Sequence, residues 1–282
     1  MKIKLWKGFE MPNNDFTLNK TLIFDIKGPM AHFRKYYTNS SSLSYLFPPR
    51  TVVIGLIAGL LGIPSEKHTK VMEDTYYEKF SEKRCFVTIS LRTKIKRIMQ
   101  TVNYLATDNF PKTPYKLLLK MIAGEIGPTQ IPLEILVPEN NGEIIYRIYF
   151  YHTDSKMYAE LRNRLEAKKY IFPPYMGITE FLASIDYIDE GKVSKNPNWE
   201  VKLNSVCKLK EVELCFTGED LQYIAEKMPT GFSNDRTPKE PCVYVCEIKS
   251  KVTNIKLKDN ISCYFVTYSE GGRQLIENIL FM

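Results

Sequence analysis

The pattern of apolar and polar positions predicts short strands separated by a few helices. A β-rich run over residues 20–27 ends at Gly28-Pro29 and predicts a first strand. The apolar, glycine-spaced run from Val52 to Gly62 follows a proline pair and stops at Ile63-Pro64. Proline suits a first helical turn, so we expect a helix that begins near residues 49–51.

The middle of the chain is expected to alternate between strands and helices. Residues 85–100 are predicted to form a long strand or a hairpin, and the runs 131–137 and 144–152 are predicted to pair as a hairpin. Residues 101–128 lose the strand pattern and are predicted to form a protruding insertion. Polar or mixed helices are expected over residues 65–83 and 115–123.

A further helix is predicted from residue 154 to about 168, because Asp154 or Ser155 can cap it and Leu161 and Leu165 lie at helical spacing. A strand at residues 183–187 follows. The order strand, helix, strand, strand, helix, strand predicts an α+β fold with a ferredoxin-like, RRM-like βαββαβ domain over residues 1–190.

Residues 191–282 are expected to form a smaller, β-rich C-terminal lobe. Its predicted elements are strands near residues 206–216, 242–252 and 262–268 and one short helix over 219–228.

The composition is that of an ordinary soluble protein with a modest excess of base. Lys and Arg number 39 against 32 Asp and Glu, so the net charge of +7 permits a polyanionic partner without requiring one. No secretory leader is evident, and the longest apolar run is shorter than the roughly twenty residues that span a bilayer. A cytoplasmic protein without a membrane anchor is therefore expected.

Metal and cofactor chemistry is not expected. The six cysteines are scattered, Cys242 and Cys246 miss the spacing of a zinc knuckle, and the chain has only three histidines. Neither a phosphate-binding P-loop nor a serine nucleophile elbow occurs.

Cations and aromatic rings gather in one segment, Phe33-Arg34-Lys35-Tyr36-Tyr37 and then Tyr45-Leu46-Phe47-Pro48-Pro49-Arg50-Thr51. Aromatic faces can stack on unpaired bases, and Arg and Lys can hold phosphates. RNA is therefore the first partner to test. Tyr36 and Tyr37 are expected to point in opposite directions if the backbone there is extended.

A second group of cations lies in the predicted strand 85–100. Arg92, Lys94 and Lys96 alternate, so an extended backbone would place all three on one face. Such a face is a candidate phosphate-binding rail.

Three motifs together resemble the fifth family of CRISPR-associated (Cas) proteins, in the RAMP superfamily. They are Phe33-Arg34-Lys35 after the first strand, Tyr45-x-Phe47-Pro48-Pro49-Arg50-Thr51 leading into Gly55 to Gly62, and Pro174-Tyr175-Met176-Gly177-Ile178-Thr179-Glu180-Phe181-Leu182-Ala183. The resemblance is specific in the first sixty-odd residues and weak beyond Tyr187. Gly177 alone stands where RAMP proteins often have a fuller glycine-rich loop.

The resemblance implies a non-catalytic subunit of a type I surveillance complex, Cascade, of subtype I-B. Such a subunit grips the 5′ handle of CRISPR RNA, joins the large subunit (eighth Cas family) to the backbone (seventh Cas family), and meets target DNA indirectly. The insertion 101–128 would be its thumb. The expected RNA-binding residues are Phe33, Arg34, Lys35, Tyr36, Tyr45, Arg50, Arg92, Lys94, Lys96, Tyr175, Gly177 and Thr179.

An endoribonuclease is the alternative. One branch of the same family cuts precursor CRISPR RNA without metal, using a Tyr, Lys and His set. A general base would take the 2′-OH proton here, and His32 or His68 are the candidates. His68 lies after the first helix, where no matching motif supports this role. His32, next to the Phe33-Arg34-Lys35 motif, is better located and is the first to test. Stable binding without turnover is nevertheless preferred.

Overall fold

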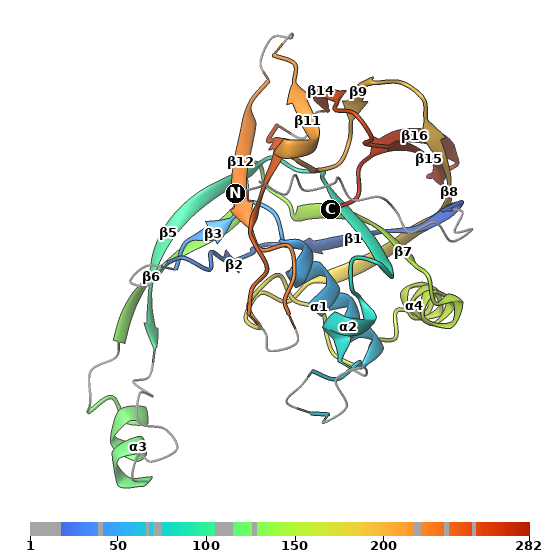
Figure 1. The fold of residues 1–282 in the computed structure, drawn as a ribbon. Helices are drawn as coiled ribbons and strands as arrows, with labels where there is room; N and C mark the ends of the chain where they lie inside the picture. Colours follow the sequence, from blue (N-terminus) through green and yellow to red (C-terminus); the bar gives the residue numbers. More distant parts are fainter. Residues whose placement is uncertain are drawn as a thin grey trace, which may run out of the picture.

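The computed structural model describes residues 18–38, 42–65, 68–69, 75–104, 115–125, 129–216, 221–233, 237–249 and 252–282. Its centre is a six-stranded sheet whose neighbouring strands all run antiparallel (Figure 1). The strands follow the order β16 (Arg273–Ile279), β15 (Cys263–Glu270), β8 (Ser184–Asn196), β1 (Lys20–Gly28), β7 (Ile144–His152) and β4 (Cys85–Leu91). The fold is mixed α/β and consists mostly of strands, in agreement with the predicted class at that level.

Two helices cover one face of this sheet, α1 (Arg50–Leu61) and α4 (Ser155–Ala167) (Figure 1). Pro49 precedes α1, and Gly62 ends it in the left-handed conformation at φ 71°. Asp154 caps α4 by accepting hydrogen bonds from the backbone N–H groups of Lys156 and Met157 at 2.9 and 3.3 Å. Both predicted helices are therefore confirmed.

The sheet is buried on both faces, as β1 shows. Successive residues of this strand point to opposite faces, and both sets are buried. Leu22 and Phe24 belong to the main core with residues of α1 and α4. Ile23 packs on the other side in a cluster with Val266 of β15 and Ile279 of β16. The outer edge of β4 is covered too, because the N–H of Met282 donates to the carbonyl oxygen of Val87 at 2.9 Å.

A long two-stranded ribbon projects from this body (Figure 1). It consists of β5 (Ile95–Tyr104) and β6 (Thr129–Pro138), and α3 (Tyr115–Ile122) lies at its far end. The short helix predicted at residues 115–123 is confirmed. The protrusion is longer than predicted, since its strands begin at residue 95 and end at residue 138. Residues 105–114 and 126–128 of the predicted thumb lie outside the described residues.

Two predicted pairings are wrong. The run 85–100 breaks at residues 92–94 into β4 and β5, which join different sheets. The expected hairpin between 131–137 and 144–152 does not form, because β6 pairs with β5 while β7 pairs with β1 and β4. In the predicted polar helix 65–83 the structure describes only α2 (Tyr76–Lys79); residues 66–67 and 70–74 lie outside the described part.

The remaining strands form two small sheets. They are β10 (Cys207–Lys208), β13 (Cys242–Glu247) and β12 (Tyr223–Met228), and β11 (Val212–Leu214), β14 (Thr253–Leu257) and β9 (Glu200–Leu203), with a 3-10 turn, η2 (Leu209–Glu211). The predicted helix over 219–228 is wrong in its described part, where β12 pairs with β13.

The predicted boundary at residue 190 falls inside β8, and β15 and β16 belong to the large sheet. The two predicted domains thus share one sheet. Met228, Tyr244 and Cys246 of the small sheets are part of the main core as well. None of the described helices has the length and apolar character needed to cross a membrane.

Candidate nucleic-acid interface

The segment rich in cations and aromatic rings folds as a small hairpin at the base of the ribbon. β2 (Phe33–Arg34) pairs with β3 (Ser44–Tyr45), and the backbone of Ala31 exchanges hydrogen bonds with Leu136 of β6 at 3.0 and 2.9 Å. The hairpin and the ribbon are therefore joined through their backbones at this point. Residues 39–41 of the hairpin lie outside the described part.

Two predicted stacking rings of this hairpin lie in the interior. Phe33 is buried and packs edge-on against Tyr146, with ring centroids 5.8 Å apart. Tyr45 is buried, and its phenol donates to the carbonyl oxygen of Lys227 at 3.0 Å. Burial raises the pKa of this phenol well above its usual value, so it stays protonated at neutral pH. Neither ring is available to a base, so the interface proposed below does not include them.

The exposed part of the hairpin carries Arg34, Tyr36 and Tyr37. Arg34 reaches solvent, and its guanidinium donates to the carbonyl oxygen of Thr38 at 3.3 Å. Tyr36 and Tyr37 are each about half exposed, and their rings meet edge to face with centroids 5.2 Å apart. The extended backbone that would point them in opposite directions is not present, because the chain turns at these residues.

Lys35 does not face solvent freely, because it forms an ion pair that sequence reasoning missed. Its ammonium lies 2.7 Å from the carboxylate of Glu226 in β12 and 5.5 Å from the centroid of the Tyr45 ring. Arg97 of β5 binds the other oxygen of the same carboxylate at 2.6 Å. We call Lys35, Glu226 and Arg97 the Glu226 triad. It joins the hairpin, the ribbon and the C-terminal strands through one buried carboxylate.

Arg50 is buried, and its contacts are structural. It is the first residue of α1. The guanidinium donates to the carbonyl oxygens of Phe80 and Cys85, each at 2.9 Å. It thereby satisfies two backbone acceptors in the interior and cannot reach a phosphate in this conformation.

The predicted rail of Arg92, Lys94 and Lys96 does not form a single face. The chain leaves strand geometry at residues 92–94, so the alternation is interrupted. Lys94 and Lys96 are exposed, whereas Arg92 turns toward the large sheet, where its guanidinium binds the carboxylate of Glu277 at 2.6 Å. Two of the three cations remain available to a polyanion.

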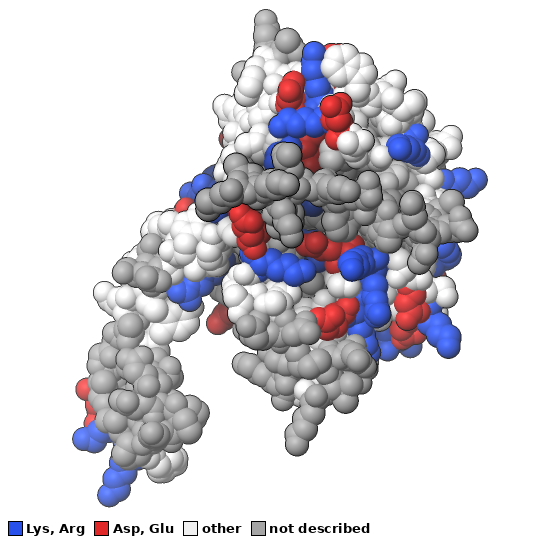
Figure 2. All heavy atoms as spheres, viewed as in Figure 1, with Lys and Arg blue, Asp and Glu red and all other residues white. Residues whose placement is uncertain are grey.

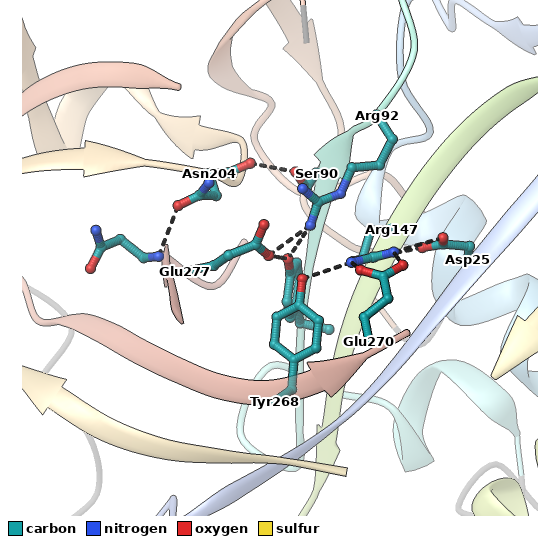
Figure 3. A network of polar contacts seen from close by, with 10 residues as sticks. Asp25, Ser90, Arg92, Arg147, Asn204, Tyr268, Glu270 and Glu277 are labelled. Carbon is teal, nitrogen blue, oxygen red and sulfur yellow. Dashed lines mark hydrogen bonds and ion pairs between the residues drawn. The ribbon is translucent and has the colours of Figure 1, made fainter. Parts of the chain in front are cut away.

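Arg92 belongs to a polar network on the sheet face opposite the helices (Figure 3). Arg147 lies at its centre and binds Asp25 through Nε at 2.7 Å, Glu270 through Nη2 at 2.6 Å and the Tyr268 phenol through Nη1 at 2.7 Å. The Arg147 hydrogen bond lowers the pKa of Glu270 below its ordinary value.

The second half of the network surrounds Glu277. Burial would raise the pKa of this carboxyl, but the hydrogen bond and the charge of Arg92 outweigh it, so the pKa lies below its usual value. Tyr149 donates its phenolic proton to Glu277 and accepts from Arg92 at 2.9 Å. The opposite charges of this network pair with one another, and the pairs link β15 and β16 to β1 and β7.

The loop after α4 brings the remaining predicted residues close to the hairpin. Tyr175 and Thr179 are exposed. Gly177 has φ 92°, and a Cβ there would lie 1.8 Å from the carbonyl oxygen of His32. The lack of a side chain therefore allows the backbone at Gly177 to pack closely against the hairpin. We assign this glycine a structural role.

The two candidate bases have different surroundings. His32 is buried, with Nδ1 2.7 Å from the carbonyl oxygen of Glu134 and Nε2 2.9 Å from the Ser42 hydroxyl. Burial lowers its pKa, so the ring is neutral at pH 7, and both ring nitrogens have partners. His68 is exposed, and its Nδ1 lies 3.1 Å from the Ser65 hydroxyl. Within the described ranges no cluster of three His, Cys, Asp or Glu side chains could hold a metal ion.

The ribbon completes the surface. Figure 2 shows separate basic side chains on the ribbon and others at its far end. On β5 the exposed side chains include Lys96, Met99 and Tyr104. On α3 both Lys116 and Lys120 are exposed. A strand with spaced cations and apolar groups can follow an extended polyanion while contacting its bases.

One family model matches part of the chain. Residues 21–116, which include the hairpin, α1 and β5, match the model of the family described as CRISPR-associated protein (Cas_Cas5). The curated proteins include no match. Over residues 21–116 the chain is therefore similar to the fifth family of CRISPR-associated proteins.

Several solved structures are similar at low identity. A CRISPR protein from Archaeoglobus fulgidus is 12% identical with a TM-score of 0.49, over 92% of this chain and 99% of that one. A chain of a CRISPR RNA-guided surveillance complex is 11% identical with a TM-score of 0.43, over 84% and 90%. A chain of a type III-B Cmr-β complex bound to cognate target RNA is 11% identical with a TM-score of 0.44, over 82% and 86%. The similarity to the CRISPR-associated family rests on the family model over residues 21–116.

Proposed function

We propose that this chain is a non-catalytic RNA-binding subunit of a type I Cascade complex in antiviral defence, and that it grips the 5′ handle of CRISPR RNA. One observation carries the proposal. The exposed residues of segment 33–37 are Arg34, Tyr36 and Tyr37, and they lie on a hairpin whose backbone is joined to the projecting ribbon. Lys94 and Lys96 lie at the base of that ribbon. Cations and stackable rings thus flank one corner of the molecule.

The proposed RNA-binding surface consists of the exposed part of the predicted set. Its members are Arg34, Tyr36, Lys94, Lys96, Tyr175 and Thr179, together with Tyr37. Lys35 joins them if the Glu226 carboxylate releases it. Base stacking on a tyrosine contributes about 1–3 kcal/mol, and each lysine adds one phosphate contact.

The domain architecture we propose is ferredoxin-like. The strand order β8-β1-β7-β4 with α1 between β1 and β4 and α4 between β7 and β8 supports it. The ribbon with α3 would then be the thumb. In this proposal the chain contacts the seventh-family backbone and the eighth-family large subunit, meets target DNA indirectly, works in the cytoplasm and belongs to subtype I-B.

The proposal of binding without cleavage is supported by the surroundings of His32. Both of its ring nitrogens are engaged inside the protein, so it cannot take a proton from a ribose hydroxyl in this conformation. Of the two candidate bases, the exposed His68 is the one that remains for an endoribonuclease. Incubation with labelled repeat RNA and EDTA tests this directly, and a site-specific product lost in His68→Ala would overturn the non-catalytic proposal.

Binding itself is tested by the salt dependence of CRISPR repeat RNA affinity, measured by fluorescence anisotropy. Replacing both Lys94 and Lys96 by Gln should lower the slope of log K against log salt by about 1.4, because each lost contact to a single strand removes about 0.7. The matched control is Lys156→Gln/Lys169→Gln, which removes the same charge from exposed positions in and just after α4. Equal slopes in the two double variants would contradict the proposed surface.

A further inference from the structure

Trp199 is a large aromatic residue that is mostly exposed. It is 61% accessible and directly precedes β9, which lies at the end of the molecule opposite α3 (Figure 1). Burial of so large an apolar ring normally stabilises a fold, and aromatic side chains left in the open are enriched where a ligand stacks. The family match, residues 21–116, does not include this region.

The ring lines a shallow hollow of about 600 Å³. Leu257 and Ile261 contribute apolar wall, and Lys210, Lys256 and Lys258 contribute cations. A flat aromatic surface beside apolar side chains and ammonium groups matches the two parts of a nucleotide, its base and its phosphate.

The walls of the hollow are fixed by the backbone. The N–H of Leu257 donates to the carbonyl oxygen of Trp199 at 2.7 Å, and that of Lys258 donates to the carbonyl oxygen of Glu211 at 3.0 Å. The N–H of Ile261 closes a turn by donating to the carbonyl oxygen of Lys258 at 3.2 Å. A site held in this way loses little freedom when a ligand enters.

One lysine of the hollow contacts the indole. The Lys256 ammonium lies 4.9 Å from the centroid of the Trp199 ring and 2.9 Å from the carboxylate of Glu200. Lys256 therefore covers part of the ring and is already paired. Lys210 and Lys258 are exposed and form no ion pair with any other described residue.

From these features we propose that the hollow binds one nucleotide of a single-stranded nucleic acid. The base stacks on the open part of the Trp199 ring, and a phosphate lies between Lys210 and Lys258. Glu213 and Asp259 also line the hollow, so its charge balance favours a single phosphate over a continuous backbone track. This site is separate from the hairpin and ribbon surface, and it shares with the proposed function only the class of ligand.

The experiment uses Trp199 as its own reporter. The sequence has two tryptophans, so Trp6→Phe in the full chain leaves Trp199 as the only one. A short oligouridylate and an oligothymidylate of equal length should each quench its emission in a saturable way, and their relative affinities distinguish RNA from DNA. Inorganic tripolyphosphate, which has no base, should compete without quenching.

Two variants test whether Lys210 and Lys258 contact the phosphate and whether Trp199 contacts the base. Lys210→Gln/Lys258→Gln should weaken the quenching titration and lower its salt slope by about 0.7 to 1.4. Trp199→Leu should reduce affinity for a labelled oligonucleotide at least about fivefold by anisotropy. Lys156→Gln/Lys169→Gln is the matched control and should titrate like the parent.

Each failure has a separate meaning. Oligonucleotides that bind by anisotropy but leave Trp199 emission unchanged would overturn this inference and leave the proposed function intact. If neither oligonucleotide bound, this inference would be overturned, while the proposed function would still be decided by the titration with CRISPR repeat RNA. Quenching by polyglutamate but not by oligonucleotides would assign the hollow to an acidic protein segment and overturn the nucleotide assignment.

Discussion

The Glu226 triad makes a sharp prediction, because one buried carboxylate holds two cations that could otherwise face RNA. Glu226→Gln keeps the shape of the side chain and one acceptor oxygen but removes the charge shared by Lys35 and Arg97. The side chain of Glu226 is 4% exposed, that of Lys35 13% and that of Arg97 34%. The cations can therefore turn toward water after the change.

The expected loss of stability follows from these contacts. A hydrogen bond to a charged group contributes about 1.5–3 kcal/mol, and the share of Arg97 is discounted because a third of its side chain is solvated. We expect Glu226→Gln to lower the free energy of unfolding by about 2 kcal/mol. Urea denaturation with an unchanged m-value measures it.

The same variant should bind RNA with a steeper salt dependence. Freed Lys35 and Arg97 add up to two phosphate contacts, so the slope should grow by about 0.7 to 1.4. Glu160→Gln on α4 is the control, because it also removes the carboxylate partner of an arginine, Arg164, but at an exposed position. If Glu226→Gln lost less than about 0.5 kcal/mol and its slope matched that of Glu160→Gln, the reasoning about the triad would be refuted.

Two further predictions concern the packing and the charge network. Gly177→Ala should destabilise the chain by more than about 2 kcal/mol in urea denaturation, because a Cβ would collide with the His32 carbonyl at a positive φ. The control is Gly272→Ala, at φ 77° with open space around it, which should cost only the strain of that φ, about 1–2 kcal/mol. Equal losses of stability in the two variants would contradict the packing argument. The pKa of Glu270 is lowered by Arg147, so its stabilising contribution is complete above pH 4.5, the ordinary value, and is lost as the pH falls through the lower folded pKa. Glu270→Gln should therefore flatten the loss of stability below pH 4.5 in urea midpoints measured across that range, and an unchanged acid profile would contradict this.

Local signals locate several elements correctly. Asp154 precedes a helical apolar repeat and does cap α4, and the alternating run at residues 144–152 is β7 with the predicted bounds. These elements follow from interactions within a few residues. Which strands pair with one another depends on residues far apart in the chain. The sequence pattern therefore pairs β6 with β7, although β6 pairs with β5 in the structure.

The error at β12 has a tertiary cause. Its sequence, Tyr223-Ile-Ala-Glu-Lys-Met228, is rich in residues that favour helices. Pairing with β13 and the contacts of Glu226 with Lys35 and Arg97 hold it extended instead. Packing overrides a weak local preference, and nothing in the local pattern reveals it.

The candidate site is predictable only in part for a similar reason. A sequence shows where cations are, but not whether an acid or a carbonyl group far along the chain already binds them. Charge alone groups Arg50 and Arg92 with Lys94 and Lys96. In the structure, however, Arg50 binds the carbonyl oxygens of Phe80 and Cys85, and Arg92 binds Glu277.

The closure of the large sheet by β15 and β16 has a consequence for how the protein is made. β8 ends at residue 196 and β16 at residue 279, so 83 further residues must be synthesised before the sheet is complete. At about 5–20 residues per second this takes roughly 4 to 17 seconds. During that time the outer edge of β8 is an open template for another strand, and Arg147 has Asp25 but not Glu270 as a partner. Nascent chains of this protein should therefore depend on holding chaperones until the last hairpin leaves the ribosome.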